Sequence, residues 1–327
     1  MLKRNITILF ITVVLSACGG QNYNFVDDFP EKGTLSYETV HYNAVKMFPI
    51  EIYPISEDVR LCQLINSEYY FAILNKEFKE IARFGRAGQG PEEFIYAIYE
   101  GITGISCDTM SLQVRDWATG KLYAAYVNMH NGILRSSLIK EYEPGMRTIK
   151  SLGNGKYLCN NNANRYYFDD NGTISYLEGW DEGINDSMEN PKYYVPNNQT
   201  LESLSRDSSR LIIYSLSYPI LYLHSMKDGT LLNKTCVEMK PEEFLSHEDC
   251  PICFRGGGYV GDNIALLLRD DVKSTSHILI FNKDLQPLIS YDVPSINTLR
   301  TNPETGKALS VDYENELIYM FDLSKWL

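Results

Sequence analysis

A strand–turn–strand unit recurs along the chain, and this repetition restricts its fold more than any other feature. One copy reads YYFAILNKEFKEIARFG from Tyr69, and similar copies begin at Leu112, Arg165, Ile220, His277 and Glu316. Their turns lie near Asn75, Asp116, Asp169, Lys227, Asn282 and Asp322, at spacings of 41, 53, 58, 55 and 40 residues. The runs are β-branched and aromatic, and no window carries a capped helical stripe. Six such units predict an all-β fold, a six-bladed β-propeller of four-stranded antiparallel blades.

The end of the repeat raises the question of how the ring closes. The last unit finishes at the C-terminus, so no residues are left there to complete the sixth blade. An incomplete blade would expose a strand edge. The segment HYNAVKMFPIEIY, His41 to Tyr53, is strand-like and precedes the first unit. We expect it to supply a strand to the last blade and so to close the ring.

The first twenty residues have the pattern of an export signal. Lys3 and Arg4 precede an apolar run that is too short to span a bilayer as a helix. The segment LSAC that follows resembles the lipobox of bacterial lipoproteins, in which the cysteine becomes the first mature residue and carries acyl chains such as palmitate. The resemblance implies a signal peptide over 1–17, lipidation of Cys18, a lipidated tether over 18–34 and a propeller over 35–327. The alternative is a plain signal peptide with a chance cysteine.

Residue 19 and the overall charge bear on location and partners. Gly19 stands where an aspartate would retain a proteobacterial lipoprotein in the inner membrane, so the resemblance implies the outer membrane. The periplasmic and the cell-surface side both stay open. A net charge of −12 without a basic run argues against a nucleic-acid partner. We expect a monomer that is held at the membrane by its lipid anchor and binds an unknown protein or saccharide.

The stretch RFGRAGQGPEEF, Arg83 to Phe94, is either a phosphate cradle or a corner between blades. A P-loop needs Lys-Ser/Thr after the last glycine and a helix behind it, and neither is present. In a propeller, the glycines would permit close backbone approach and Phe94 would fill the space between neighbouring blades. We therefore favour the corner, with Arg83 and Arg86 as candidate contacts for an anionic ligand.

The same stretch also carries a family resemblance. It is similar to the linker of NHL-like propellers and to that of the six-bladed, TolB-like propeller lipoproteins of Bacteroidetes. The hairpin repeat and the lipobox extend this resemblance over nearly the whole chain. It implies the propeller fold and adds little about function, since that family is itself poorly characterised.

A second unusual run, SHEDCPICFRGGG, contains Cys250 and Cys253 at C-x2-C spacing. A structural zinc site needs four ligands and no second C-x2-C exists, so we expect no metal and no cofactor. Three alternatives stay open: buried thiols, a disulfide or redox pair between these two cysteines, or a disulfide with a neighbour such as Cys236. Arg255, just before three glycines, would lie near the start of an inner strand and is a further candidate ligand contact.

The remaining motifs favour binding over catalysis. The chain has no G-x-S-x-G, no H-E-x-x-H and no calcium loop. We expect a non-catalytic binding or interaction propeller for a protein, peptide or saccharide. The alternative is a hydrolase or lyase, similar to propeller lactonases, that gathers acids and histidines at the central channel. The segments DTM and DSM resemble the O-glycosylation pattern of Bacteroidetes and make Thr109 and Ser187 candidates for modification.

Overall fold

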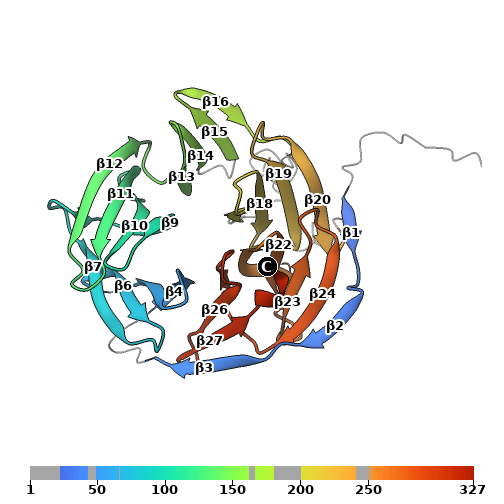
Figure 1. Cartoon of the computed structure of the whole chain (residues 1–327). Helices are drawn as coiled ribbons and strands as arrows, with labels where there is room; N and C mark the ends of the chain where they lie inside the picture. The colour runs from blue at the N-terminus through green and yellow to red at the C-terminus, as the bar shows by residue number, and fades with distance from the viewer. Residues whose placement is uncertain are drawn as a thin grey trace, which may run out of the picture.

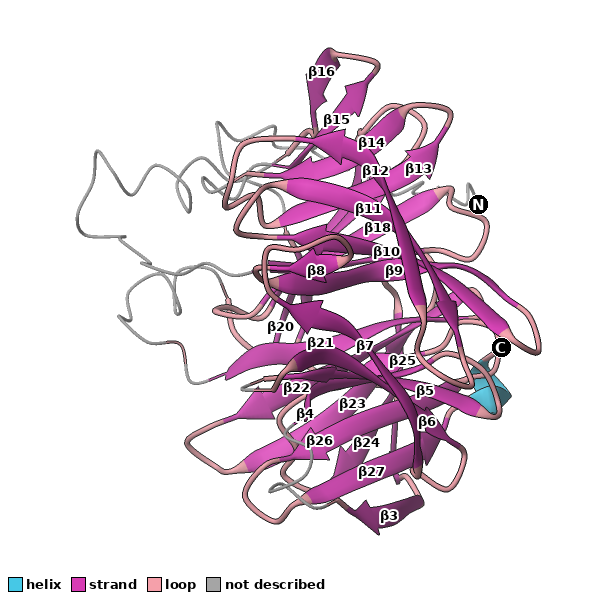
Figure 2. Ribbon diagram, turned by 90° about the vertical axis from the view of Figure 1, so that its left-hand side faces the viewer, coloured by secondary structure: helices cyan, strands magenta, loops and turns pink. Residues whose placement is uncertain are grey.

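The computed structural model of the protein contains six β-sheets arranged in a ring (Figure 1). It describes residues 23–42, 49–65, 67–161, 166–179, 200–240, 250 and 252–327. Over these residues the regular structure is strand, apart from the short 3-10 helix η2 (Ser324–Trp326), as the side view in Figure 2 also shows. None of the described helical structure is long and apolar enough to cross a membrane. The ring confirms the prediction of an all-β, six-bladed β-propeller.

Blades 1 to 3 follow one another along the chain, each with its first strand nearest the centre (Figure 1). Blade 1 comprises β4 (Pro49–Pro54), β5 (Val59–Leu64), β6 (Tyr69–Asn75) and β7 (Glu80–Ala87), with the short β8 (Glu93–Phe94) added at the rim. Blade 2 comprises β9 (Ala97–Ile105), β10 (Thr109–Asp116), β11 (Lys121–Asn128) and β12 (Leu134–Glu141). Blade 3 comprises β13 (Thr148–Gly153), β14 (Lys156–Asn160), β15 (Tyr166–Asp170) and β16 (Thr173–Tyr176).

Blades 4 and 5 repeat this order, and blade 6 departs from it. Blade 4 comprises β17 (Thr200–Leu204), β18 (Arg210–Ser215), β19 (Ile220–Ser225) and β20 (Leu231–Val237). Blade 5 comprises β21 (Ile252–Val260), β22 (Asn263–Asp270), β23 (Thr275–Phe281) and β24 (Pro287–Val293). Blade 6 takes only three strands from the C-terminal part, β25 (Arg300–Thr301), β26 (Lys307–Asp312) and β27 (Leu317–Asp322).

The fourth strand of blade 6 belongs to an N-terminal belt, residues 24–41, that runs along the rim of three blades (Figure 1). β1 (Asn24–Val26) pairs in parallel with β20, and β2 (Glu31–Thr34) pairs in parallel with β24. β3 (Tyr37–His41) then pairs antiparallel with β27. The belt confirms that an N-terminal strand closes the ring. It also puts two strands inside the range 18–34, where the sequence predicts a tether.

The closing strand lies earlier in the chain than predicted. Within the described part of the segment His41–Tyr53, only His41 pairs with β27, opposite Leu317. Residues 49–54 form β4, which pairs with β5 in blade 1. The side chains of β3 are almost all exposed, because an outermost strand has little to pack against. It therefore lacks the apolar alternation that identifies a strand in a sequence.

The repeat units also map onto the blades with two differences from expectation. Four of them form the third and fourth strands of a blade, as β6 and β7 do in blade 1. The second unit instead forms β10 and β11, the second and third strands of blade 2. The last unit contains one strand only, since η2 follows Asp322 and β3 takes the remaining place.

The hydrophobic core is divided among the contacts between blades. Six clusters of buried apolar side chains occur in the described residues, and each joins two neighbouring blades. Phe71 and Phe84 of blade 1, for example, pack with Met110 and Leu112 of blade 2. The strands of a single blade bury little on their own, so each blade depends on both neighbours for stability.

Removing β3 should open the ring. We expect a chain that begins at residue 42 to be less stable than one that begins at residue 36 by about 1–5 kcal/mol, because it loses five cross-strand pairs worth about 0.2–1 kcal/mol each. The freed edge of β27 should also promote aggregation. Urea unfolding and size-exclusion chromatography of both chains would measure these effects. Equal stability of the two chains would contradict the closing role of β3.

Candidate functional site

The inner strands of the blades surround a central channel with two sections. The larger has a volume of about 570 Å³ and is lined by residues near the start of these strands, among them Glu51, Thr148 and Thr200. The smaller has a volume of about 270 Å³ and is lined by residues near their ends, such as Leu204. We call the end with the larger section the mouth. The residues that line both sections form the waist: Tyr53, Tyr99, Glu100, Leu201, Glu202 and Arg300.

An ion pair at the waist joins blade 6 to blade 1. The Arg300 guanidinium donates to both carboxylate oxygens of Glu51, with Nε 3.0 Å from Oε2. The Tyr53 hydroxyl donates to the same carboxylate. Burial raises the pKa of Tyr53 well above its ordinary value, and the Glu51 charge acts in the same direction. Burial alone would lower the pKa of Arg300, but Glu51 outweighs it and the pKa is raised.

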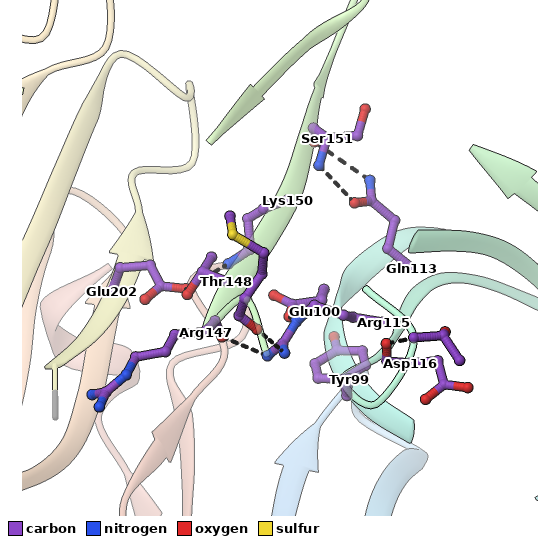
Figure 3. A network of polar contacts seen from close by, with 12 residues as sticks. Tyr99, Glu100, Gln113, Arg115, Asp116, Arg147, Thr148, Lys150, Ser151 and Glu202 are labelled. Atoms are coloured by element: carbon purple, nitrogen blue, oxygen red, sulfur yellow. Dashed lines mark hydrogen bonds and ion pairs between the residues drawn. The ribbon is translucent and has the colours of Figure 1, made fainter. Parts of the chain in front are cut away.

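A second pair lies within blade 2 and is nearly inaccessible to water. Glu100 is 7% exposed and Arg115 is 3% exposed, and the guanidinium donates to the carboxylate. Arg115 also donates to the carbonyls of Met146, at 2.6 Å, and Arg147, at 2.5 Å (Figure 3). Burial raises the pKa of the Glu100 carboxyl, and the charge of Arg115 opposes that rise. The pair therefore keeps a buried carboxylate compensated.

A third carboxylate, Glu202 of β17, joins blade 4 to blade 3. It accepts hydrogen bonds from the Thr148 hydroxyl at 3.2 Å and the Tyr166 hydroxyl at 2.8 Å. The Lys150 ammonium lies 3.9 Å from it (Figure 3). Each glutamate of the channel is thus held by a cation that another blade or strand supplies. These three carboxylates are therefore already compensated.

The triple glycine of blade 5 lets the inner strands of blades 4, 5 and 6 approach closely. A Cβ atom at Gly258 would lie 2.8 Å from Ser203 Oγ of β17 and 2.9 Å from Thr301 Oγ1 of β25. A side chain there would push these strands apart. Arg255, at the start of this run, pairs with Asp271 at 2.8 Å and does not line either channel section.

Three aromatic residues, Tyr70, Tyr96 and Trp117, form a platform beside the mouth. The ring centroids of Tyr96 and Trp117 lie 6.0 Å apart, and those of Tyr70 and Tyr96 lie 6.1 Å apart, both edge to face. Tyr96 and Trp117 are 42% and 44% exposed and line the larger channel section. The buried Asp116 fixes their backbone, since its carboxylate accepts the amides of Ile95 and Tyr96 at 3.0 Å.

The stretch Arg83–Phe94 is a corner between blades 1 and 2, as the sequence predicts. Phe94 is 1% exposed and packs edge to face on Tyr123 of blade 2, with 5.5 Å between centroids. The Glu93 carboxylate accepts the Gly90 amide at 2.8 Å and occupies the position that a bound anion would take. Arg83 pairs with Glu80 at 2.8 Å, and Arg86 pairs with Glu68 at 3.0 Å. Their role as ligand contacts stays a prediction.

The other predicted sites lie apart from the channel sections. Cys250 and Cys253 are free thiols, and no disulfide occurs among the described cysteines. Burial raises the pKa of the Cys250 thiol to about 11, which leaves little thiolate at neutral pH. Thr109 begins β10 and is partly buried. Cys18 and Ser187 lie outside the described residues.

The histidines that the structure describes do not assemble at the channel. The four in the described part are His41, His130, His224 and His277, and none of them lines either section. His224 is fully buried in blade 4, where burial lowers its pKa to about 4. Across the described residues, no group of three His, Cys, Asp or Glu side chains could hold a metal ion.

Comparison with known proteins gives the fold alone. No family model and no curated protein matches the sequence. Of three similar solved structures, two are described as β-propeller domains and one as a putative exported protein. The first is the Cps50 (Swd1) β-propeller domain of Myceliophteria thermophila, with a TM-score of 0.53, 7% identity, and 87% of this chain and 98% of that chain covered.

The second similar structure is a putative exported protein of Bacteroides fragilis NCTC 9343. It has a TM-score of 0.52 and 10% identity, and the match covers 89% of this chain and 98% of that chain. The third is the WD40 β-propeller domain of Doa1, with a TM-score of 0.50, 11% identity and coverage of 88% and 97%. At these identities the likeness supports the propeller architecture and says nothing of the ligand.

The channel residues were not identified from the sequence. Glu100 and Arg115 come together because β9 and β10 are adjacent antiparallel strands of blade 2. One signal was available: Arg115 stands in the strand-like run SLQVRD, and a charge that is buried in a strand requires a partner. The sequence gives no means of naming that partner.

Replacing Arg115 with Met should be strongly destabilising. The change leaves the Glu100 carboxylate and two carbonyls buried without a donor, at a cost of about 3–5 kcal/mol. Arg86→Met is the matched control, since its pair with Glu68 is exposed and should contribute about 1 kcal/mol or less. Urea unfolding of both variants would test the difference. A cost for Arg115→Met as small as that of the control would contradict the buried-pair interpretation.

Proposed function

We propose that the chain is an envelope-anchored lipoprotein whose propeller binds a protein, peptide or saccharide at the channel mouth without catalysing a reaction. The observation that carries this proposal is the platform: exposed aromatic rings, held by a buried carboxylate, border a cavity of about 570 Å³. Rigid Tyr and Trp side chains provide contact area at a low cost in conformational entropy. Small-molecule sites in other proteins likewise combine aromatic walls with a few precisely positioned polar groups.

The proposed anchor is Cys18, in the outer membrane. The LSAC segment supports it, and one similar solved structure is described as an exported protein. Only five residues separate Cys18 from Asn24, where the belt begins. The six Cα–Cα steps from Cys18 to Asn24 reach at most about 22 Å when fully extended. The anchor would therefore hold the rim of blade 4 close to the lipid surface.

The alternative of a hydrolase or lyase has no specific observation in its favour among the described residues. The three channel glutamates are each bonded to a cation or a hydroxyl donor. A general acid or base must come within hydrogen-bond reach of the substrate proton that it transfers, so it cannot be fully engaged by other partners. The same contacts suit a rigid binding surface.

Loss of the anchor should release the protein. We expect Cys18→Ser to abolish incorporation of labelled palmitate and to shift the protein from the membrane to the soluble fraction. Cys107→Ser is the matched control, since Cys107 is exposed and lies in the propeller. Fractionation and labelling of cells that produce either variant would test this. Unchanged membrane association of Cys18→Ser would remove the lipoprotein part of the proposal.

A partner at the mouth should be within reach of a photocrosslinker. We expect p-benzoylphenylalanine at position 95, beside the platform, to form an adduct in cells. The same group at position 174, on the outer strand of blade 3, should not. Ile95 and Ile174 are both exposed, so the two substitutions are comparable in bulk and in access. Equal labelling at both positions, or none at 95, would contradict binding at the mouth.

A further inference from the structure

The dimensions of the mouth limit what can enter it. Its volume of about 570 Å³ lies within the range of small-molecule sites, about 300–1,000 Å³. At the waist, the rings of Tyr53 of blade 1 and Tyr99 of blade 2 pack against each other, with 4.4 Å between their centroids. A folded domain cannot enter this space. A small ligand, or one end of a chain-like ligand, can occupy it and leave the rest outside.

One wall of the mouth is aromatic and rigid. The Trp117 amide donates to the Tyr96 carbonyl at 2.9 Å, and the Asp116 carboxylate accepts the amides of Ile95, Tyr96 and Ala118. These bonds fix the backbone that carries both rings. The electron-rich face of an aromatic ring attracts weakly positive C–H groups. The C–H face of a sugar ring has that character.

The mouth is also lined by polar groups, and the carboxylates of Glu51 and Glu202 among them are compensated. Glu51 is paired with Arg300, and Glu202 with Lys150 and the Thr148 hydroxyl. An ionic ligand would have to break one of these pairs or leave a net charge in a confined space, and both are costly. A hydroxyl group both donates and accepts, so it can bond to a carboxylate and to a guanidinium without separating them.

We infer that the channel mouth binds a neutral saccharide, with a sugar ring against Trp117 and Tyr96 and hydroxyls directed to the pairs at Glu51 and Glu202. The inference rests on the proposed binding function and specifies its ligand class. A protein or peptide ligand would be recognised through its charges and amide groups. The carboxylates of Glu51 and Glu202 are already paired with cations and so are poor partners for a further charge.

The test is calorimetric titration of the lipid-free propeller with neutral disaccharides, the corresponding uronic-acid disaccharides and a dipeptide panel. We expect at least one neutral disaccharide to bind, with a Kd that changes little between about 0.05 and 0.5 M salt. Trp117→Ala and Tyr96→Ala should each weaken that binding about tenfold or more. Tyr126→Ala, a similarly exposed tyrosine on β11, should leave it unchanged.

Three results would overturn the saccharide assignment. They are tighter binding of a uronate or a dipeptide, absence of binding by every neutral disaccharide, and neutral binding that Trp117→Ala and Tyr96→Ala leave intact. A protein-sized adduct from the crosslinker at position 95 would also count against a saccharide while supporting the proposed binding function. Failure of the crosslinking experiment itself would remove both proposals.

Discussion

The pairing of β3 with β27 is the contact on which the rest of the molecule depends. A blade buries its apolar faces only against its two neighbours, so every interface needs the ring to be complete. Blade 6 supplies three strands from the C-terminal part and would end in an open edge without β3. The belt extends this closure across blades 4 and 5. The channel keeps its dimensions because the ring cannot spread.

The channel uses polar contacts where the blade interfaces use apolar ones. Glu51 with Arg300 and Glu202 with Thr148 connect inner strands of different blades. Arg115, which is paired with Glu100 of its own blade, donates to two carbonyls just before β13 of blade 3. Such pairs contribute little net stability compared with apolar packing, but losing one partner is expensive. They favour one arrangement of the inner strands over others. The interior is consequently hydrophilic and fixed in shape, which suits recognition of a polar ligand.

The sequence was sufficient for the fold and insufficient for the site. Strand periodicity, turn residues and the spacing of the units predicted the six blades, and Phe94 was correctly placed at a corner. The closing strand was predicted too late in the chain, because the exposed residues of β3 have no apolar alternation that would identify them as a strand. The channel pairs were missed because residues such as Glu51 and Arg300 are distant in sequence, and only the closed ring brings them together. Trp117 and Tyr96 were not identified as site residues, because the hydrogen bonds of Asp116 that hold their backbone cannot be read from a sequence.

The belt also determines when this protein can fold. Its first described strands pair with blades encoded in the last third of the chain, so most of the sequence must be available before β3 finds β27. Contacts between such distant residues form slowly, because the entropy of closing a long loop is lost before the contacts contribute any stabilisation. A chain that emerges N-terminus first through a membrane would wait with exposed strand edges until its final residues arrive. Protection of that waiting chain, and not the stability of the finished ring, would then limit how much of the protein a cell can accumulate.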